Sequence, residues 1–233
     1  MNLDEYFKRI GLHGPYDNPD LATLKLIHKQ HVMSVPFENL SIHCGEPNIM
    51  DLEVIFNKIV RSRRGGWCLE NNFLFGWVLR EMGYDTTMLG SRVFDSTSND
   101  LPPTVSHLIN MVVIDGKAYI ADVSFGVSCQ VWEPLELISG KDQPQAAGVF
   151  RLIEKGTSGC WRKLVESQRF LIQILLNQIL STGMKHSRSS ASPWCPVRLI
   201  IFLRKTTFSR QILLHCSPIN PSALCKHRQD LEP

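Results

Sequence analysis

Residues 63–72 read RRGGWCLENN, a glycine pair followed by a tryptophan and a cysteine where a helical pattern begins. Apolar residues recur at helical spacing from Leu69 to Met82, which predicts a helix whose N-terminus lies near Cys68. The unpaired N–H groups and the dipole at a helix N-terminus favour a thiolate, the nucleophilic form of cysteine. A lone cysteine on an apolar helix is nevertheless more often a buried core residue than a catalyst.

Residues 106–125 read SHLINMVVIDGKAYIADVSF and predict a β-hairpin, because two apolar runs flank Asp115-Gly116. A two-residue turn at this dipeptide makes His107 and Asp122 diagonal neighbours on one face of the hairpin. A histidine oriented by an aspartate is the partner that a cysteine nucleophile needs. A structural hydrogen bond is the competing interpretation of this pair, and the cysteine turn upstream favours catalysis.

The order of the remaining patterns indicates an α+β fold, because helical segments precede strands. An apolar stripe starts at Leu3 and ends at Gly11, and Asn18–Asp20 and Asp51 are suited to cap two further helices. The helix after the cysteine is expected to end near residue 83. Strands are expected over 86–89, in the hairpin at 107–124, and over 150–153.

The composition of the 233 residues, with 43% hydrophobic and 20% charged side chains, is typical of a soluble globular protein. The N-terminal residues MNLDEYFKRIG lack the apolar core of a signal peptide, and the apolar stretch 170–176 is too short to cross a bilayer. Seven irregularly spaced cysteines argue against a disulfide framework, and no CxxC or HxxxH pair suggests a metal site. We therefore expect a cytoplasmic protein without a metal.

Four segments carry a resemblance to arylamine N-acetyltransferases, and to the vertebrate forms in particular. They are VPFENL at 35–40, RGGWC at 64–68, SHL at 106–108 with Asp122, and LELISGKDQPQ at 135–145. The resemblance runs over residues 1–157 and implies a Cys68–His107–Asp122 triad on a fold distantly similar to cysteine proteases and transglutaminases. It also implies acetyl transfer from acetyl-CoA to aromatic amines or hydrazines through an acetyl-cysteine, with no bound cofactor.

The resemblance assigns roles to residues around the triad. It implies an ion pair between Glu38 and Arg64, although from the sequence alone Arg64 is equally compatible with an unpaired surface arginine. It implies that Pro103 and Thr104 contact coenzyme A. It further implies a monomer that binds small-molecule substrates and has no nucleic-acid or membrane partner. Residues that would bind the acceptor are Phe37, Val93, Ser106, Phe125 and Val127. Without the resemblance, Phe125 would be interpreted as a core aromatic residue.

The resemblance implies a helical domain over 1–83, an incomplete β-barrel domain over 84–157, and a departure from the family over 158–233. A shifted reading frame takes each codon's third base together with the first two bases of the next codon, which permits only a few residues at each position. From Ser158 onward the permitted residues include WVLEKISRKPK, which is similar to the family's continuation. We therefore expect 158–233 to be an out-of-frame, poorly ordered tail and the family's third α/β domain to be missing. A splice fragment, an indel and a gene-model error are all compatible with this pattern.

The charge distribution changes at the same point in the chain. Residues 1–157 hold 14 basic and 19 acidic side chains, whereas residues 158–233 hold 11 and 3. A basic segment can indicate nucleic-acid or membrane affinity. In an out-of-frame tail the basic charge carries no functional meaning.

Three functions remain compatible with the sequence. The first is an acetyltransferase whose activity is impaired in this chain. The second is a cysteine hydrolase that uses the same triad, which the pairing of PFENL with RGGWC argues against. The third is a truncated by-product that keeps the triad residues without a working cleft. Product analysis separates the first two, and a solubility and unfolding assay separates both from the third.

Overall fold

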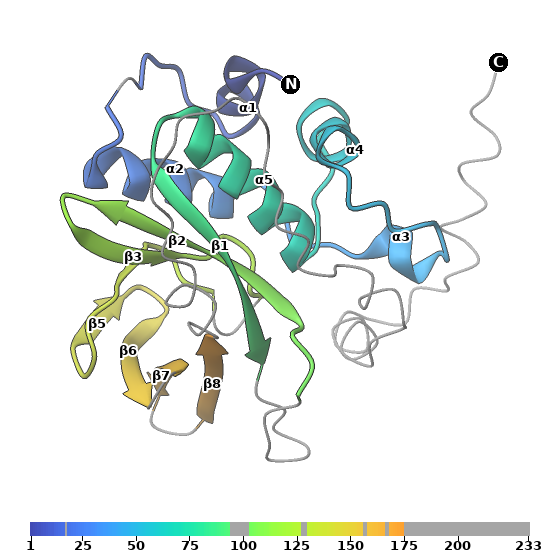
Figure 1. The fold of residues 1–233 in the computed structure, drawn as a ribbon. Coiled ribbons are helices and arrows are strands. Elements are labelled where there is room, and N and C mark those ends of the chain that lie inside the picture. Colours follow the sequence, from blue (N-terminus) through green and yellow to red (C-terminus); the bar gives the residue numbers. More distant parts are fainter. Residues whose placement is uncertain (17, 94–102, 127–129, 156–157, 166–167, 175–233) are drawn as a thin grey trace, which may run out of the picture. The chain divides into compact units, whose positions relative to one another are not determined.

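The computed structural model describes residues 1–16, 18–93, 103–126, 130–155, 158–165 and 168–174 (Figure 1). Helices precede strands along the chain, which confirms the predicted α+β class. The helices are α1 (Leu3–Arg9), α2 (Leu21–Ser34), α3 (Leu40–His43), α4 (Leu52–Phe56), the π-helix η1 (Asn57–Arg61) and α5 (Cys68–Glu81). The strands are β1 (Asp85–Val93), β2 (His107–Ile114), β3 (Lys117–Ala121), β4 (Leu135–Glu136), β5 (Asp142–Gln145), β6 (Gly148–Lys155), β7 (Ser158–Val165) and β8 (Gln168–Ile174).

Short polar side chains start the helices where the sequence predicts them. The Asp20 carboxylate accepts the N–H of Thr23 at 2.7 Å at the start of α2. At the start of α4, Asp51 accepts the N–H of Val54 at 3.0 Å. Such side chains satisfy N–H groups that have no partner within the helix. The helix α5 is followed by Gly83, whose φ of 87° suits a glycine after a helix C-terminus.

The strands form an antiparallel sheet in the order β4-β3-β2-β1-β8-β7-β6-β5. Ile114 of β2 pairs with Lys117 of β3, so the predicted two-residue turn is confirmed. Asp115 and Gly116 have φ values of 49° and 74°, which is the left-handed geometry that twisted hairpins favour. This register brings His107 and Asp122 to the same end of the hairpin.

The expected partial barrel is an open ladder among the described residues, because its two edge strands, β4 and β5, do not pair with each other. A side chain joins them instead. The Glu136 N–H of β4 donates to Gln143 Oε1 of β5 at 2.8 Å, and Gln143 Nε2 donates to the Glu136 carbonyl at 2.9 Å.

The sheet also continues past residue 157, where the sequence analysis ended the strand domain. The strands β7 and β8 form a hairpin that pairs with β6 on one side and with β1 on the other. Runs such as QRFLIQI are rich in residues that favour strands, and main-chain pairing depends little on side-chain identity. The rest of the predicted tail, 175–233, lies outside the described residues.

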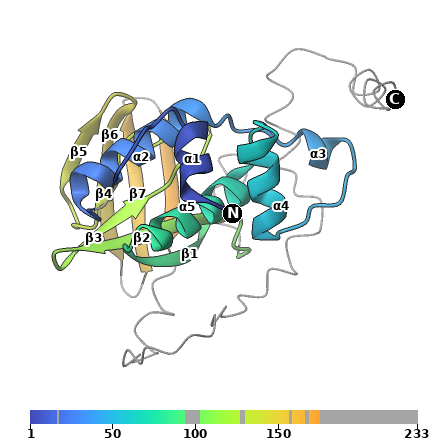
Figure 2. The same cartoon turned by 90° about the horizontal axis from the view of Figure 1, so that it is seen from above.

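The described residues group into two compact units. One unit contains Met1–Glu38 and the described residues from Met50 onward, and the other contains Asn39–Ile49 with α3. Helices and strands share the first unit because α5 packs on β1 and β2, and one core joins Phe75 of α5 to Val112 of β2. Figures 1 and 2 show α2 and α5 beside β1–β3, with β5–β8 extending the sheet.

Among the residues that the model describes, no helix is both long enough and apolar enough to cross a membrane.

Two buried histidines on α2 predict a loss of stability in acid. Burial lowers the pKa of His28 to about 4, and burial with the charges of His28 and Arg9 lowers the pKa of His31 to about 3. Below about pH 6.5 these histidines bind protons in the unfolded chain but not in the folded protein. The free energy of unfolding is therefore undiminished above pH 6.5 and decreases as the pH falls.

The free energy of unfolding should decrease between pH 7 and pH 5. We expect this decrease to be about 2 kcal/mol smaller in His31→Leu than in the wild type. Urea unfolding at the two pH values measures this difference. The control is His13→Leu, which removes an exposed histidine instead of a buried one. Equal pH dependence in the wild type and in His31→Leu would contradict the prediction.

Candidate active site

Cys68 is the first residue of α5, as the sequence predicts, and it is buried with 5% of its surface exposed. The preceding glycines lie against a second segment of the chain. Gly66 N–H donates to the Pro36 carbonyl at 3.2 Å, and Glu38 N–H donates to the Gly66 carbonyl at 3.0 Å. The VPFENL and RGGWC motifs are therefore neighbours, and their contact fixes the chain that leads into Cys68.

The approach of these two segments predicts the effect of a substitution at Gly65. A Cβ atom at this residue would lie 2.1 Å from the Pro36 carbonyl oxygen, which belongs to the main chain and cannot rotate away. We expect Gly65→Ala to lower the free energy of unfolding by about 3 kcal/mol or more, the upper end of typical overpacking costs.

Thermal unfolding of Gly65→Ala measures this loss. The matched control is Gly66→Ala, where the nearest atom to the new Cβ is the Ile59 methyl at 3.0 Å, which is able to move. A Gly65→Ala protein as stable as Gly66→Ala would contradict the prediction.

Four charged side chains surround the same loop. The predicted ion pair is present, with Arg64 3.0 Å from Glu38. Lys58 extends it, because its ammonium lies 2.8 Å from Glu70 and 3.5 Å from Glu38. Glu70 also accepts the Trp67 N–H at 3.1 Å, which ties the network to the residue before Cys68.

His107 and Asp122 are in direct contact, as the hairpin register predicts. His107 Nε2 donates to Asp122 Oδ2 at 2.7 Å, and both side chains are almost completely buried. The Cys68 thiol is the other polar neighbour that acts on the His107 ring. The three residues that the sequence predicts as a triad therefore lie together.

The charges of this cluster reinforce one another. Burial would lower the pKa of His107, but the Asp122 carboxylate and the neighbouring Cys68 raise it to about 10. Burial would raise the pKa of Asp122, but His107, the Asn72 amide and the Ser124 N–H lower it below its usual value. An imidazolium held by a carboxylate beside a thiol is the arrangement that stabilises a thiolate nucleophile.

Comparisons with known proteins identify the family of this chain. A model of the N-acetyltransferase family matches residues 20–174. The chain belongs to the arylamine N-acetyltransferase family. It is 54% identical over 168 residues to the arylamine N-acetyltransferase pineal gland isozyme NAT-10 of Gallus gallus, covering 72% of this chain and 58% of that protein. The members that it resembles are named as enzymes of acetyl transfer.

Solved structures of the family share the fold. The arylamine N-acetyltransferase of Salmonella typhimurium matches with a TM-score of 0.70 and 30% identity, over 75% of this chain and 63% of that one. The Mycobacterium marinum family member in complex with CoA matches with a TM-score of 0.65 and 31% identity, over 74% of this chain and 64% of that one. The chain spans between 55% and 63% of the length of three curated relatives from Gallus gallus and Mus musculus.

The other residues expected from the family resemblance lie at different distances from the triad. Phe125 packs directly on the triad, because the chain leaves β3 after Ala121 and the Phe125 ring centroid lies 5.1 Å from that of His107, edge to face. Phe37 lies opposite Gly66 in the loop before Cys68. Ser106 directly precedes His107 and donates its N–H to the Ser91 carbonyl at 3.0 Å.

The remaining expected residues lie at the end of β1, in the bend before β2, or outside the described residues. Val93 ends β1 and packs on the core of the sheet. Pro103 and Thr104 are exposed in a bend before β2. Val127 lies outside the described residues.

Asp122 has further side-chain partners that the sequence does not predict, among them Asn72 and Gln130. Asn72 Nδ2 donates to Asp122 Oδ1 at 2.9 Å, and Gln130 Nε2 donates to the Asp122 carbonyl at 2.9 Å. A signal for Asn72 was available, because it follows Cys68 by four residues and so lies on the same face of α5. No local pattern points to Gln130, since its contact depends on how the chain turns after β3.

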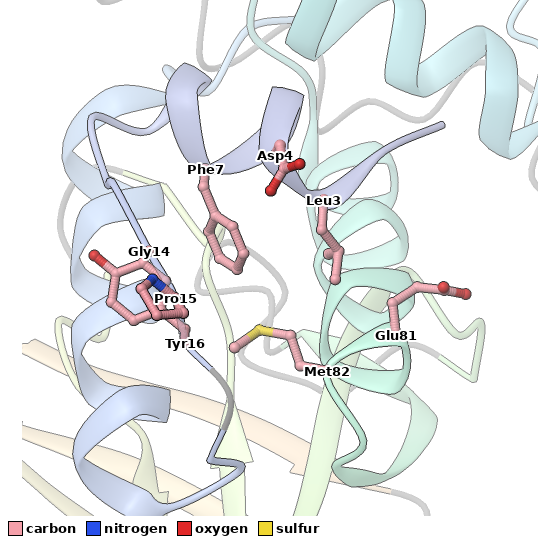
Figure 3. A pocket seen from close by; sticks show the side chains of 8 residues that line it. All are labelled: Leu3, Asp4, Phe7, Gly14, Pro15, Tyr16, Glu81 and Met82. Atoms are coloured by element: carbon pink, nitrogen blue, oxygen red, sulfur yellow. The ribbon is translucent and has the colours of Figure 1, made fainter.

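A separate cavity of about 530 Å³ lies between α1, the loop at 14–16 and the end of α5 (Figure 3). Its lining residues are Leu3, Asp4, Phe7, Gly14, Pro15, Tyr16, Glu81 and Met82, which include none of the predicted site residues. Within the described ranges, no three His, Cys, Asp or Glu side chains are grouped so that they could hold a metal ion.

Proposed function

We propose that this chain acts as an arylamine N-acetyltransferase, in which Cys68 carries the acetyl group between acetyl-CoA and an aromatic amine or hydrazine. The observation that carries the proposal is the buried contact of His107 with Asp122 beside the Cys68 thiol. The family membership supports the reaction class, and the resemblance to a family member in complex with CoA supports the donor.

In the first half-reaction the Cys68 thiolate attacks the thioester carbonyl of acetyl-CoA. A bond forms between Sγ and the carbonyl carbon, the bond between that carbon and the coenzyme sulfur breaks, and the His107 imidazolium protonates the leaving thiolate. The N–H groups in the first turn of α5 have no partners within the helix and are suited to stabilise the oxyanion. The products are acetyl-Cys68 and free coenzyme A.

In the second half-reaction the amine nitrogen attacks the acetyl carbonyl. The carbon–nitrogen bond forms, the bond to Sγ breaks, and the now neutral His107 accepts a proton from the amine. This step restores the thiolate and the imidazolium. Asp122 keeps one ring nitrogen of His107 occupied throughout, which orients the ring and stabilises its charged form.

The expected residues around the triad extend the proposal. Phe37, Val93, Ser106, Phe125 and Val127 would line the acceptor site, and Pro103 and Thr104 would contact coenzyme A. The edge-to-face packing of Phe125 on His107 supports this assignment most directly. We further propose a cytoplasmic monomer whose partners are these two small molecules.

Product analysis tests the proposed reaction. The chain is incubated with acetyl-CoA and an aromatic amine, and the acetylated amine and free acetate are both measured over time. The proposal expects acetyl-amine to form in excess of acetate, in proportion to released coenzyme A. Release of coenzyme A matched by acetate alone, at every amine concentration, would favour the cysteine hydrolase and reject the transferase.

If the sequence beyond residue 157 is out of frame, as we expect, the rate of acetyl transfer should be impaired. We expect faster acetylation of the amine, by at least about tenfold, in a variant whose sequence follows the shifted frame from Ser158 onward. Such a variant would regain the family's continuation, and with it the binding energy from coenzyme A that is realised in the transition state. Turnover at saturating amine measures this gain. Equal turnover of the two proteins would contradict the impairment without affecting the triad.

A further inference from the structure

The segment Asp122–Phe125 carries two of the groups that contact His107. Asp122 accepts a hydrogen bond from its ring at 2.7 Å, and the Phe125 ring packs on it edge to face. The segment begins where β3 ends at Ala121, so it does not belong to the ladder of the sheet. Its conformation therefore needs another source of restraint.

Side chains supply that restraint. The N–H of Asp122 donates to His28 at 3.2 Å, and the N–H of Val123 donates to Asn72 at 3.0 Å. The Ser124 N–H donates to the Asp122 carboxylate at 3.1 Å. The Phe125 N–H donates to Gln130 Oε1 at 2.9 Å. Each of the four N–H groups thus ends on a side chain.

Gln130 differs from the other partners because its amide binds both ends of the segment. While Oε1 accepts the Phe125 N–H, Nε2 donates to the Asp122 carbonyl at 2.9 Å and to the Val131 carbonyl at 2.8 Å. The amide group is planar and short, so these bonds fix the separation between the Asp122 carbonyl and the Phe125 N–H. One side chain thereby couples the two groups that flank His107.

We propose that Gln130 is a positioning residue, which holds Asp122 and Phe125 in register against His107 and so sets the reactivity of Cys68. The inference rests on the proposed function, which assigns Cys68 as the nucleophile and His107 as its partner. Gln130 acts through the main chain of 122–125 and does not itself touch the reacting atoms. Loss of its amide should weaken the contact between His107 and Asp122 without removing either residue.

The chain contains a matched control for this experiment. Gln143 also binds the main chain through both ends of its amide, but at a single residue, accepting the Glu136 N–H at 2.8 Å and donating to the Glu136 carbonyl at 2.9 Å. Both glutamines are half-buried, and Glu136 is not part of the candidate site. A purely structural role of such a contact should therefore produce the same effects in Gln130→Met and in Gln143→Met.

The test measures alkylation of Cys68 by iodoacetamide in the full 233-residue chain at pH 6.5 and at pH 9.5, by mass spectrometry of the Cys68 peptide. In Gln130→Met we expect alkylation at pH 6.5 to slow about tenfold, equivalent to about 1.4 kcal/mol of lost stabilisation, and the rates at pH 9.5 to converge with the wild type. Gln143→Met should match the wild type at both pH values. NMR titration of the His107 ring should reach its midpoint at a lower pH in Gln130→Met only.

The outcomes separate this inference from the proposed function. If Gln130→Met equals Gln143→Met in both measurements, the positioning role is wrong. If wild-type Cys68 is no more reactive at pH 6.5 than an ordinary thiol, the proposed function fails, and the His107 titration still decides the role of Gln130. If Gln130→Met does not fold, Gln130→Glu is used in its place, because the glutamate still provides an acceptor for the Phe125 N–H. Its control is Gln143→Glu.

Discussion

Replacing Cys68 with alanine is expected to reduce acetylation of an aromatic amine to the uncatalysed rate. The thiol is the only protein group in the proposed mechanism that bonds to the acetyl carbon, so its loss removes both half-reactions. Removal of a nucleophile from a comparable triad lowers turnover on the order of 10⁶-fold. The measurement is amine acetylation at saturating acetyl-CoA, in the 233-residue chain and in the variant that follows the shifted frame.

The control for this substitution is Cys44→Ala, since Cys44 lies outside the unit that contains the candidate site. Its turnover should equal that of the wild type. Residual turnover in Cys68→Ala within tenfold of the wild type would show that acetyl transfer proceeds without a covalent intermediate on this residue.

Asp122→Asn is the second substitution with a large expected effect. The change keeps the volume of the side chain but removes the charge that holds His107 protonated, and it leaves the ring free to adopt the wrong tautomer. The corresponding change lowers turnover about 10⁴-fold in a serine protease triad. We expect a loss of similar order here, with a lower pKa of the His107 ring, because the Asp122 carboxylate that raises this pKa is removed.

Two measurements decide this prediction. Turnover of Asp122→Asn is compared with that of Asp142→Asn, which removes an exposed carboxylate of β5 that pairs with Arg151. The latter should retain wild-type turnover. Circular dichroism reports whether the Asp122→Asn protein is folded. A folded Asp122→Asn protein with nearly normal turnover would remove this carboxylate from the mechanism.

The parts of the site that the sequence predicts are those set by local chemistry. The Asp115-Gly116 turn fixes the hairpin register, and the register brings His107 and Asp122 to the same end of the hairpin. The helical pattern begins directly after Trp67, which places Cys68 in the first turn of α5. In both cases a few neighbouring residues determine the geometry, so a pattern in the sequence is sufficient to predict it.

The parts that the sequence does not predict depend on contacts between distant residues. Asn72 and Asp122 are 50 residues apart, and their hydrogen bond exists only because α5 packs on the sheet. Lys58 reaches Glu70 from a π-helix, a local departure from α-helical geometry that the apolar pattern does not report. The pairing of β8 with β1 likewise joins residues that no local signal relates.

Mapping the acetyl group after brief incubation with acetyl-CoA and no amine tests the central claim most directly. The chain is quenched in acid, digested and examined by mass spectrometry for acetylated cysteine. The account predicts acetylation of Cys68 that disappears when an aromatic amine is added before quenching and that does not form in Asp122→Asn on the same timescale. Acetylation of Cys44 or Cys129 with Cys68 unmodified would contradict it.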